Sequence, residues 1–282
     1  MQQLTLQAQF SVPCHAVLSI AAYPKECLVA FSDLKGCNVR SVSVWKWSAR
    51  GFVRMWKKTG FEDNRHDFSV YVAFLLHRPV LLVSDGAANT VRVLSGLTGA
   101  RHGLIAPLGS IFCPREVATS AAHVAVLQGE GTVHLYQQCG DLAWQFLRRL
   151  DCFRDCKMSG LRLSVDGCML TGCYVSTRRI VFVDAVSGHV RREHSMCYPI
   201  EKEEVLAGRW VVLGPQRLVW ISECWTVVIS RPFIYCRLVH VPGFGMIKGD
   251  ALCGVDVYSS PDLLAMTAMS PLRMAWVAAN AA

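Results

Sequence analysis

Cationic and aromatic side chains alternate in one short stretch of this sequence. Residues 45–61, WKWSARGFVRMWKKTGF, interleave five cations with five aromatic rings. Cations neutralise phosphates and flat rings stack on unpaired bases, so this mixture suits single-stranded RNA. The same mixture is typical of a strand or covering loop with its rings in the core and its cations in solvent. The candidate contact residues for a protein or RNA partner are Arg50, Arg54, Trp56, Lys57 and Lys58.

Other residue types that could do chemistry do not form a recognisable set. Cys152 and Cys156 are four residues apart, and Cys168 and Cys173 follow at a wider spacing than the tight pairs of structural zinc sites. The nine histidines form no H-E-x-x-H motif, and the chain has no P-loop and no G-x-S-x-G elbow. We therefore predict no catalytic residues, no metal site and no cofactor.

The cysteines and the start of the chain bear on the compartment. There are 13 cysteines at irregular spacings, and the first residues lack the cationic region and long apolar run of a secretory signal. An odd number of cysteines without such a signal favours free thiols over a disulfide framework. We expect most of the thiols to be buried and reduced, and the protein to be cytoplasmic.

The composition narrows the class of protein. Of 282 residues, 52% are hydrophobic and 18% are charged, which excludes a disordered chain and allows a large core. The longest apolar stretches, 205–230 and 263–282, contain arginines, so we predict no membrane span. The formal net charge of +8 permits contact with nucleic acid or an acidic partner. The sequence carries no signal for an oligomeric state.

Short strand patterns follow one another along most of the chain. Runs such as CLVAF (27–31), HVAVL (123–127) and RIVFV (179–183) are bounded by turn residues and apolar throughout, which predicts strands covered on both faces. One strand per unit aligns on Val42, Val91, Val133, Ile180, Leu218 and Val255. Their mean spacing of about 43 residues is typical of a propeller, because radially stacked small sheets bury both faces of each sheet.

Three of these units resemble NHL repeats. PVLLVSDGAANTVRVL (79–94) has the apolar strand, Asp, turn and second strand of that family, and the stretches 114–136 and 160–190 are similar. The family's Asp, six residues before the aligned position, is present as Asp85 but is replaced by Leu127 and Tyr174 in the other two units. The resemblance implies an NHL-like β-propeller, and some NHL propellers bind RNA through a basic face.

We therefore predict an all-β, six-bladed β-propeller over residues 1–258, followed by a short helical tail over 259–282. Residues 4–10 alternate and should pair with the strand at 253–258, which closes a ring. Residues 46–69 are expected to be an enlarged connection between the first two units. In the predicted tail, Ser260 and Pro261 are a typical helix start.

Three functions are compatible with this architecture. The first is a non-catalytic interaction scaffold with a protein partner, and the second is a single-stranded RNA-binding propeller. The third is a calcium-dependent hydrolase or lactonase, because some six-bladed propellers hold calcium on oxygen ligands in the central tunnel. Candidate calcium carboxylates are Asp33, Asp85, Asp166 and Asp250, although aspartates exposed in turns are the commoner explanation.

Overall fold

The computed structural model of the protein describes strands and turns from residue 6 to residue 258. The described residues are 6–11, 16–35, 39–48, 51–61, 70–105, 113–129, 131–151, 153, 158–164, 166–174, 179–195, 202–206, 209–214, 217–221, 226–230, 237–241, 245–249 and 254–258. Arg50, Cys152, Cys156, Asp250 and the predicted tail at 259–282 lie outside them.

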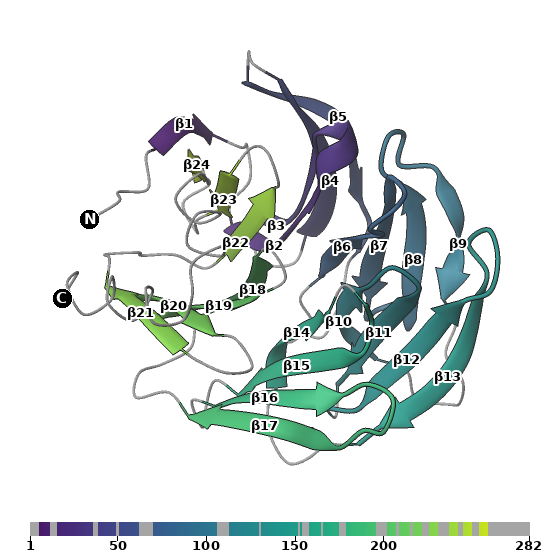
Figure 1. The fold of residues 1–282 in the computed structure, drawn as a ribbon. Helices are drawn as coiled ribbons and strands as arrows, with labels where there is room; N and C mark the ends of the chain where they lie inside the picture. Colours follow the sequence, from purple (N-terminus) through teal and green to yellow (C-terminus); the bar gives the residue numbers. More distant parts are fainter. Residues whose placement is uncertain are drawn as a thin grey trace.

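The described strands form six four-stranded antiparallel sheets (Figure 1). The first sheet is β2 (Ala16–Tyr23), β3 (Leu28–Lys35), β4 (Val39–Ser48) and β5 (Gly51–Thr59), with a 3-10 turn, η1 (Pro24–Glu26), after β2. The second is β6 (Val72–Phe74), β7 (Val80–Asp85), β8 (Thr90–Ser95) and β9 (Arg101–Ile105). The third is β10 (Pro114–Thr119), β11 (His123–Gln128), β12 (Val133–Gln138) and β13 (Trp144–Leu150).

The later sheets repeat this order of strands. The fourth is β14 (Met158–Leu163), β15 (Met169–Tyr174), β16 (Arg179–Asp184) and β17 (Val190–Ser195). The fifth is β18 (Lys202–Leu206), β19 (Arg209–Gly214), β20 (Arg217–Ile221) and β21 (Thr226–Ser230). The last contains β22 (Arg237–Val241), β23 (Gly245–Gly249) and β24 (Gly254–Tyr258), and it is completed by β1 (Leu6–Ser11).

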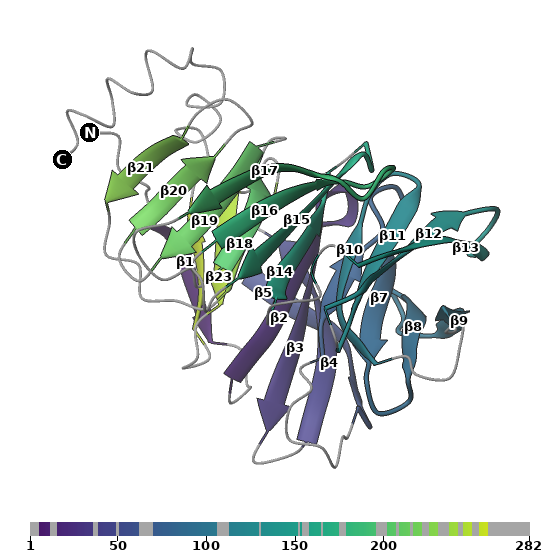
Figure 2. The same cartoon turned by 90° about the horizontal axis from the view of Figure 1, so that it is seen from below.

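The first strand of each sheet faces the middle of the arrangement. The strands β2, β6, β10, β14, β18 and β22 each contact the first strands of the two neighbouring sheets. The sheets therefore surround a common centre, with β5, β9, β13 and β17 on the outside (Figure 1). Seen from below, β2, β3 and β4 run side by side along their length (Figure 2). The chain is an all-β propeller, as the sequence predicts.

The repeat spacing follows from the four strands that each unit contributes. All six aligned positions fall on the third strand of a unit: β4, β8, β12, β16, β20 and β24. The predicted closure is also confirmed, because β1 pairs antiparallel with β24, from Leu6 opposite Tyr258 to Ser11 opposite Gly254. The two ends of the strand sequence thus share one sheet.

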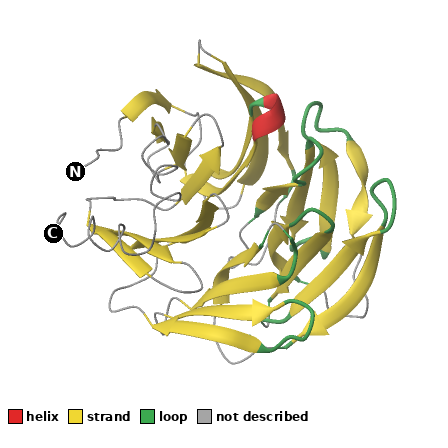
Figure 3. Cartoon of the chain, in the orientation of Figure 1, coloured by secondary structure: helices red, strands yellow, loops and turns green. Residues whose placement is uncertain are grey.

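Apolar strands pack between neighbouring sheets. All six residues of β7 are buried, because this strand is covered on both faces. Side chains from adjacent sheets make common clusters, such as Leu135 of β12 with Leu161 and Leu170 of the fourth sheet. Strands dominate the described residues, and η1 is a single helical turn (Figure 3).

One expectation about the fold is wrong. Residues 46–59 are not a connection, because β4 continues to Ser48 and β5 occupies Gly51–Thr59 as the outer strand of the first sheet. The cations of this stretch hide its strand pattern, since an outer strand has no neighbouring strand on its far side and tolerates charge. Residues 62–69 lie outside the described part of the chain.

Candidate functional site

The basic and aromatic residues of 45–61 lie on an outer β-hairpin, and the register divides them between two faces. Trp45 is opposite Arg54, whereas Val44 is opposite Trp56, so Met55 is the additional residue of a β-bulge. Side chains alternate along a strand, and opposite residues share a face. Arg54 therefore shares a face with Trp45, and Trp56 lies on the other face with Val44.

Trp56 is a contact between the first and second sheets. Its indole N–H donates a 2.8 Å hydrogen bond to the carbonyl oxygen of Gly96, and the half-buried ring packs against the core shared by these sheets. Gly99, with a φ of +72°, approaches the ring so closely that a Cβ there would lie 2.9 Å from it. The ring therefore holds two sheets together in this structure.

The cations of the hairpin have different surroundings. Lys57 Nζ lies 3.2 Å from Asp33 Oδ2, and this carboxylate is buried. Arg54 is exposed, and its guanidinium carbon lies 5.5 Å from the centre of the Trp45 ring. Lys58 is half-buried. A partner arriving from solvent would thus meet Arg54 first, together with the exposed side chains of Val53 (61%) and Met55 (42%).

The structure reveals a repeat position that sequence alignment missed. Asp33 has the same place in β3 as Asp85 has in β7, because each follows a serine that pairs with the aligned valine: Ser32 with Val42 and Ser84 with Val91. Alignment by spacing found only Asp85, since the hairpin of the first sheet is longer. Both carboxylates are 2% exposed, so they are not exposed turn residues.

Each of these two aspartates is held by a cation of its own sheet. Asp33 pairs with Lys57 of β5, and Asp85 pairs with Arg92 of β8. The Arg92 guanidinium also lies over the ring of buried Phe61, 4.6 Å from its centre. Asp166, by contrast, is exposed in a turn, where hydrogen bonds from Ser164 and Cys168 lower its pKa. These contacts assign Asp33 and Asp85 to ion pairs and Asp166 to a turn.

Four of the cysteines in the described part of the chain are thiols outside any disulfide bond, and they are less buried than expected. Cys139 and Cys168 are exposed, and Cys27 and Cys113 are half-buried. They lie in or next to connections between strands rather than inside the apolar strands, which explains the difference. The expectation of buried thiols is therefore wrong for these four, while Cys173 is on β15.

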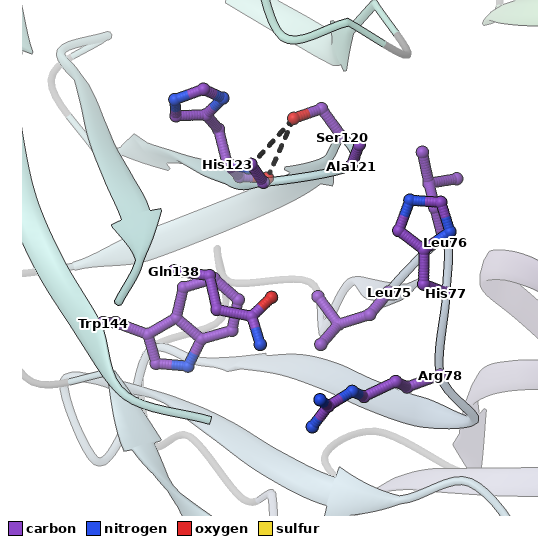
Figure 4. Close-up of a pocket in the computed structure, with 10 residues that line it drawn as sticks. Leu75, Leu76, His77, Arg78, Ser120, Ala121, His123, Gln138 and Trp144 are labelled. Carbon is purple, nitrogen blue, oxygen red and sulfur yellow. Dashed lines mark hydrogen bonds between the residues drawn. The ribbon is translucent and has the colours of Figure 1, made fainter. Parts of the chain in front are cut away.

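A pocket opens where the second and third sheets meet (Figure 4). Its walls come from the β6–β7 connection, the β10–β11 connection and the β12–β13 hairpin, and it is small and open to solvent. The side chains that argue for a binding site are His77 and Arg78 on one side, and Gln138 and Trp144 on the other. Ser120 and His123 close the third side through a 3.0 Å hydrogen bond from the His123 N–H to Ser120 Oγ.

Polar groups dominate the chemistry of this pocket. Arg78 forms an ion pair with Asp141 of the β12–β13 connection, and both side chains are exposed. The indole nitrogen of Trp144 is buried and has no hydrogen-bond partner. Gln138 Nε2 donates a 3.0 Å hydrogen bond to the carbonyl oxygen of Gly140. Sequence analysis missed the pocket because its residues come from three connections and form no local motif.

In an aromatic cluster of the third sheet, burial shifts the pKa values of two side chains. The rings of His134 and Phe146 are 5.4 Å apart, and those of Tyr136 and Phe146 are 5.7 Å apart. Burial, with a smaller contribution from Arg149, lowers the pKa of His134 below its ordinary value. Burial also raises the pKa of Tyr136 to about 12. Both side chains are thereby favoured in their neutral forms, as a packed interior requires.

Two features are absent from the described residues. Within them, no three His, Cys, Asp or Glu side chains gather closely enough to hold a metal ion. No helix in that part of the chain has the length and apolar character needed to cross a membrane.

Comparison with known proteins supports the fold. No family model matches the sequence, and no curated protein matches it. A chain of a solved structure titled "Crystal Structure of Mitotic Checkpoint Complex" superposes with a TM-score of 0.64 at 11% sequence identity. The match covers 91% of this chain and 92% of that chain. At this identity the similarity shows a shared propeller-like architecture.

Proposed function

We propose that the protein is a non-catalytic interaction scaffold with a protein partner, built on a six-bladed, NHL-like propeller and working in the cytoplasm. The observation that carries this proposal is the solvent-open pocket between the second and third sheets, with a half-buried tryptophan and an exposed arginine. Such sites suit protein partners, because Trp and Arg are the side chains most often responsible for binding energy in interfaces.

Other features support the same proposal. The structurally similar chain comes from a structure whose title calls it a complex. The shared position of Asp33 and Asp85 extends the NHL-like pattern to a second unit. The contacts between successive first strands, together with the pairing of β1 and β24, support a closed ring of six blades.

The scaffold proposal is tested by isolating the full chain from its own cells under mild crosslinking. We expect one or a few proteins in near-stoichiometric amounts, with crosslinks to lysines of the propeller. A matched pair of variants sharpens the test: Trp144→Ala alters the pocket, and Leu147→Ala alters an exposed residue of the same strand. A chain that migrates alone from native extracts, without crosslinks, would contradict the proposal.

RNA binding is a second candidate, and exposed cations on the outer strands favour it. Arg54 on β5, Arg101 on β9 and Arg148 on β13 are all exposed. We propose that single-stranded RNA would be held through its phosphates by such residues, with Arg50, Arg54, Lys57 and Lys58 of the first hairpin among them. Trp56 supports this function less, because in this structure its indole is bonded to Gly96.

Fluorescence anisotropy with labelled oligouridine measures this directly. Arg54→Ala should weaken binding and reduce the salt slope by roughly one unit. Lys25→Ala, on the exposed turn η1, is the matched control and should have a smaller effect. Binding that is absent at low salt, or equal in both variants, would overturn the RNA candidate.

A further inference from the structure

Five of the six outer strands carry a β-bulge at the same place. In each of these sheets the register shifts between the second and third residues after the aligned third-strand position. In the first sheet, for example, the shift follows Val44, two residues after Val42. One residue of the outer strand has no opposite residue at each shift. These residues are Met55 of β5, His102 of β9, Leu147 of β13, Arg191 of β17 and Gln7 of β1.

A bulge in an outer strand opposes pairing with a further strand. The free side of an outer strand presents backbone N–H and C=O groups that can template another chain. A bulge interrupts the even spacing of these groups and increases the local twist. Four of the five bulged strands also contain arginine or lysine, such as Arg54 of β5 and Arg148 of β13, and edge charges oppose pairing as well. These five edges are therefore poor templates.

The outer strand of the fifth sheet, β21, lacks both features (Figure 1). Its ladder with β20 has no register shift, from Thr226 opposite Ile221 to Ser230 opposite Arg217. Its sequence, TVVIS, has no charged residue, and four of its five residues are β-branched. Among the described strands, β20 is its one neighbour. The strand β21 thus has the regular, uncharged edge that pairs readily with another strand.

The sequence of β21 is complementary to itself. When two copies run antiparallel about Val228, Thr226 lies opposite Ser230 of the second copy, and Val227 lies opposite Ile229 of the second copy. Cross-strand pairs of β-branched residues and of hydroxyl residues stabilise sheets, and no like charges are opposite each other. A two-fold axis at Val228 relates the two chains, so the contact closes at two copies. This complementarity favours a second copy over another occupant of the edge.

We propose that two copies of this chain associate through β21. The two β21 strands pair antiparallel and join the four-stranded fifth sheets of both copies into one continuous sheet. The inference goes beyond the proposed scaffold function, which needs one chain. It gives the scaffold two propellers, and therefore two equivalent surfaces for its protein partner.

Sedimentation velocity of the purified full chain, from low to high micromolar concentration, tests this association. We expect particles with twice the mass of one chain to become more abundant as the concentration rises. Thr226→Lys combined with Ser230→Lys places cations opposite each other at both ends of the paired strands. This variant should associate at least about tenfold more weakly. The matched control is Gln145→Lys combined with Leu147→Lys, which adds the same charge to the bulged strand β13 and should leave the association unchanged.

A variant of opposite charge separates loss of pairing from loss of the fold. Thr226→Glu combined with Ser230→Glu should also remain a single chain when it is studied alone. An equimolar mixture of the lysine and glutamate variants should restore the association, because each cation then lies opposite a carboxylate of the other chain. Restored association would show that both variants are folded and that the two strands are antiparallel.

Three results would overturn the inference. The first is an original chain that sediments as a single chain at every concentration, which includes a chain whose β21 is covered by another segment. The second is equally strong association of the original chain and the lysine variant, and the third is a mixture of variants that does not associate. The scaffold proposal would survive each of these results, because crosslinks to other proteins are detected whether or not two copies associate.

Discussion

The buried carboxylate of Glu116 in β10 accepts a 2.7 Å hydrogen bond from the backbone N–H of Leu161 in β14. Its second oxygen accepts a 3.0 Å hydrogen bond from the N–H of Gly160. The pairing of β14 with β15 shifts register between Ser159 and Arg162, so these N–H groups belong to an irregular part of the strand. One side chain of the third sheet therefore accepts hydrogen bonds from backbone N–H groups that the irregular pairing leaves without partners in their own sheet.

Glu116→Gln should destabilise the protein by about 1–3 kcal/mol, because the amide replaces one of two acceptors with a donor in a buried site. Urea unfolding monitored by tryptophan fluorescence gives the change in midpoint. The matched control is Glu193→Gln, which makes the same change in an exposed ion pair with Arg179 and should cost less than about 1 kcal/mol. Equal losses in both variants would contradict the role of Glu116.

Trp56 and Gly99 should be energetically coupled. Trp56→Ala should cost about 3 kcal/mol or more through lost packing, and Trp56→Phe about 1 kcal/mol through the lost bond to Gly96. Gly99→Ala should be destabilising because its Cβ would meet the Trp56 ring and its φ is positive. In the Trp56→Ala background, only the backbone cost of about 1–2 kcal/mol should remain. A double-mutant cycle measures this difference, and strict additivity would argue against the contact.

The adjacent residues Lys57 and Lys58 provide a matched pair. Lys57→Met should lower the free energy of unfolding by about 1–3 kcal/mol, because it removes the ammonium that faces the buried carboxylate of Asp33. Lys58→Met should change stability by less than about 0.5 kcal/mol, since no ion pair of Lys58 is seen among the described residues. Thermal unfolding of both variants checks this, and the opposite order would refute the assigned ion pair.

The lowered pKa of His134 predicts how stability depends on pH. The folded chain resists protonation of this buried ring, whereas the unfolded chain protonates near the ordinary value of 6.5. The contribution is therefore fully present above that value and is lost as pH falls through it toward the lower folded pKa.

Urea unfolding between about pH 5 and about pH 8 tests this dependence. His134→Gln should flatten the decline in stability at low pH, while the exposed His102→Gln should leave it unchanged. A decline that is as steep in His134→Gln as in the original protein would show that other groups cause it.

The exposed thiols give a further prediction. Cys139 and Cys168 should react with a maleimide in the native protein before Cys27 and Cys113 do, because the latter are half-buried. Mass spectrometry after brief labelling identifies the order. Faster labelling of Cys27 than of Cys139 would contradict the exposures described above.

The sequence predicts this fold well where each strand is apolar on both faces. Val91, Val133 and Ile180 could be aligned because their strands lie between two covering sheets, which imposes the same residue types in each unit. The outer strand β5 escaped detection because solvent on its far side permits cations there. Asp33 was not detected because the number of residues between the aspartate and the aligned valine changes with the length of the hairpin. The position of the aspartate opposite the third strand does not change.

The candidate sites were harder to predict for a different reason. The cations and rings of 45–61 are neighbours in sequence, but a bulge and the alternation of β5 turn Arg54 and Trp56 to different faces. The residues of the pocket are distant in sequence and meet only after the sheets pack. No local pattern relates Arg78 to Trp144, so their proximity follows from the arrangement of the sheets.

The pairing of β1 with β24 has a consequence for the order of folding. Its partners are nearly a full chain length apart, so joining them is entropically costly until the intervening sheets have formed. This pairing should therefore be absent from the folding transition state and form late. Interactions of this kind govern how fast a protein comes apart rather than how fast it assembles. The short strand Leu6–Ser11 would then act as a kinetic latch that sets the lifetime of the native propeller.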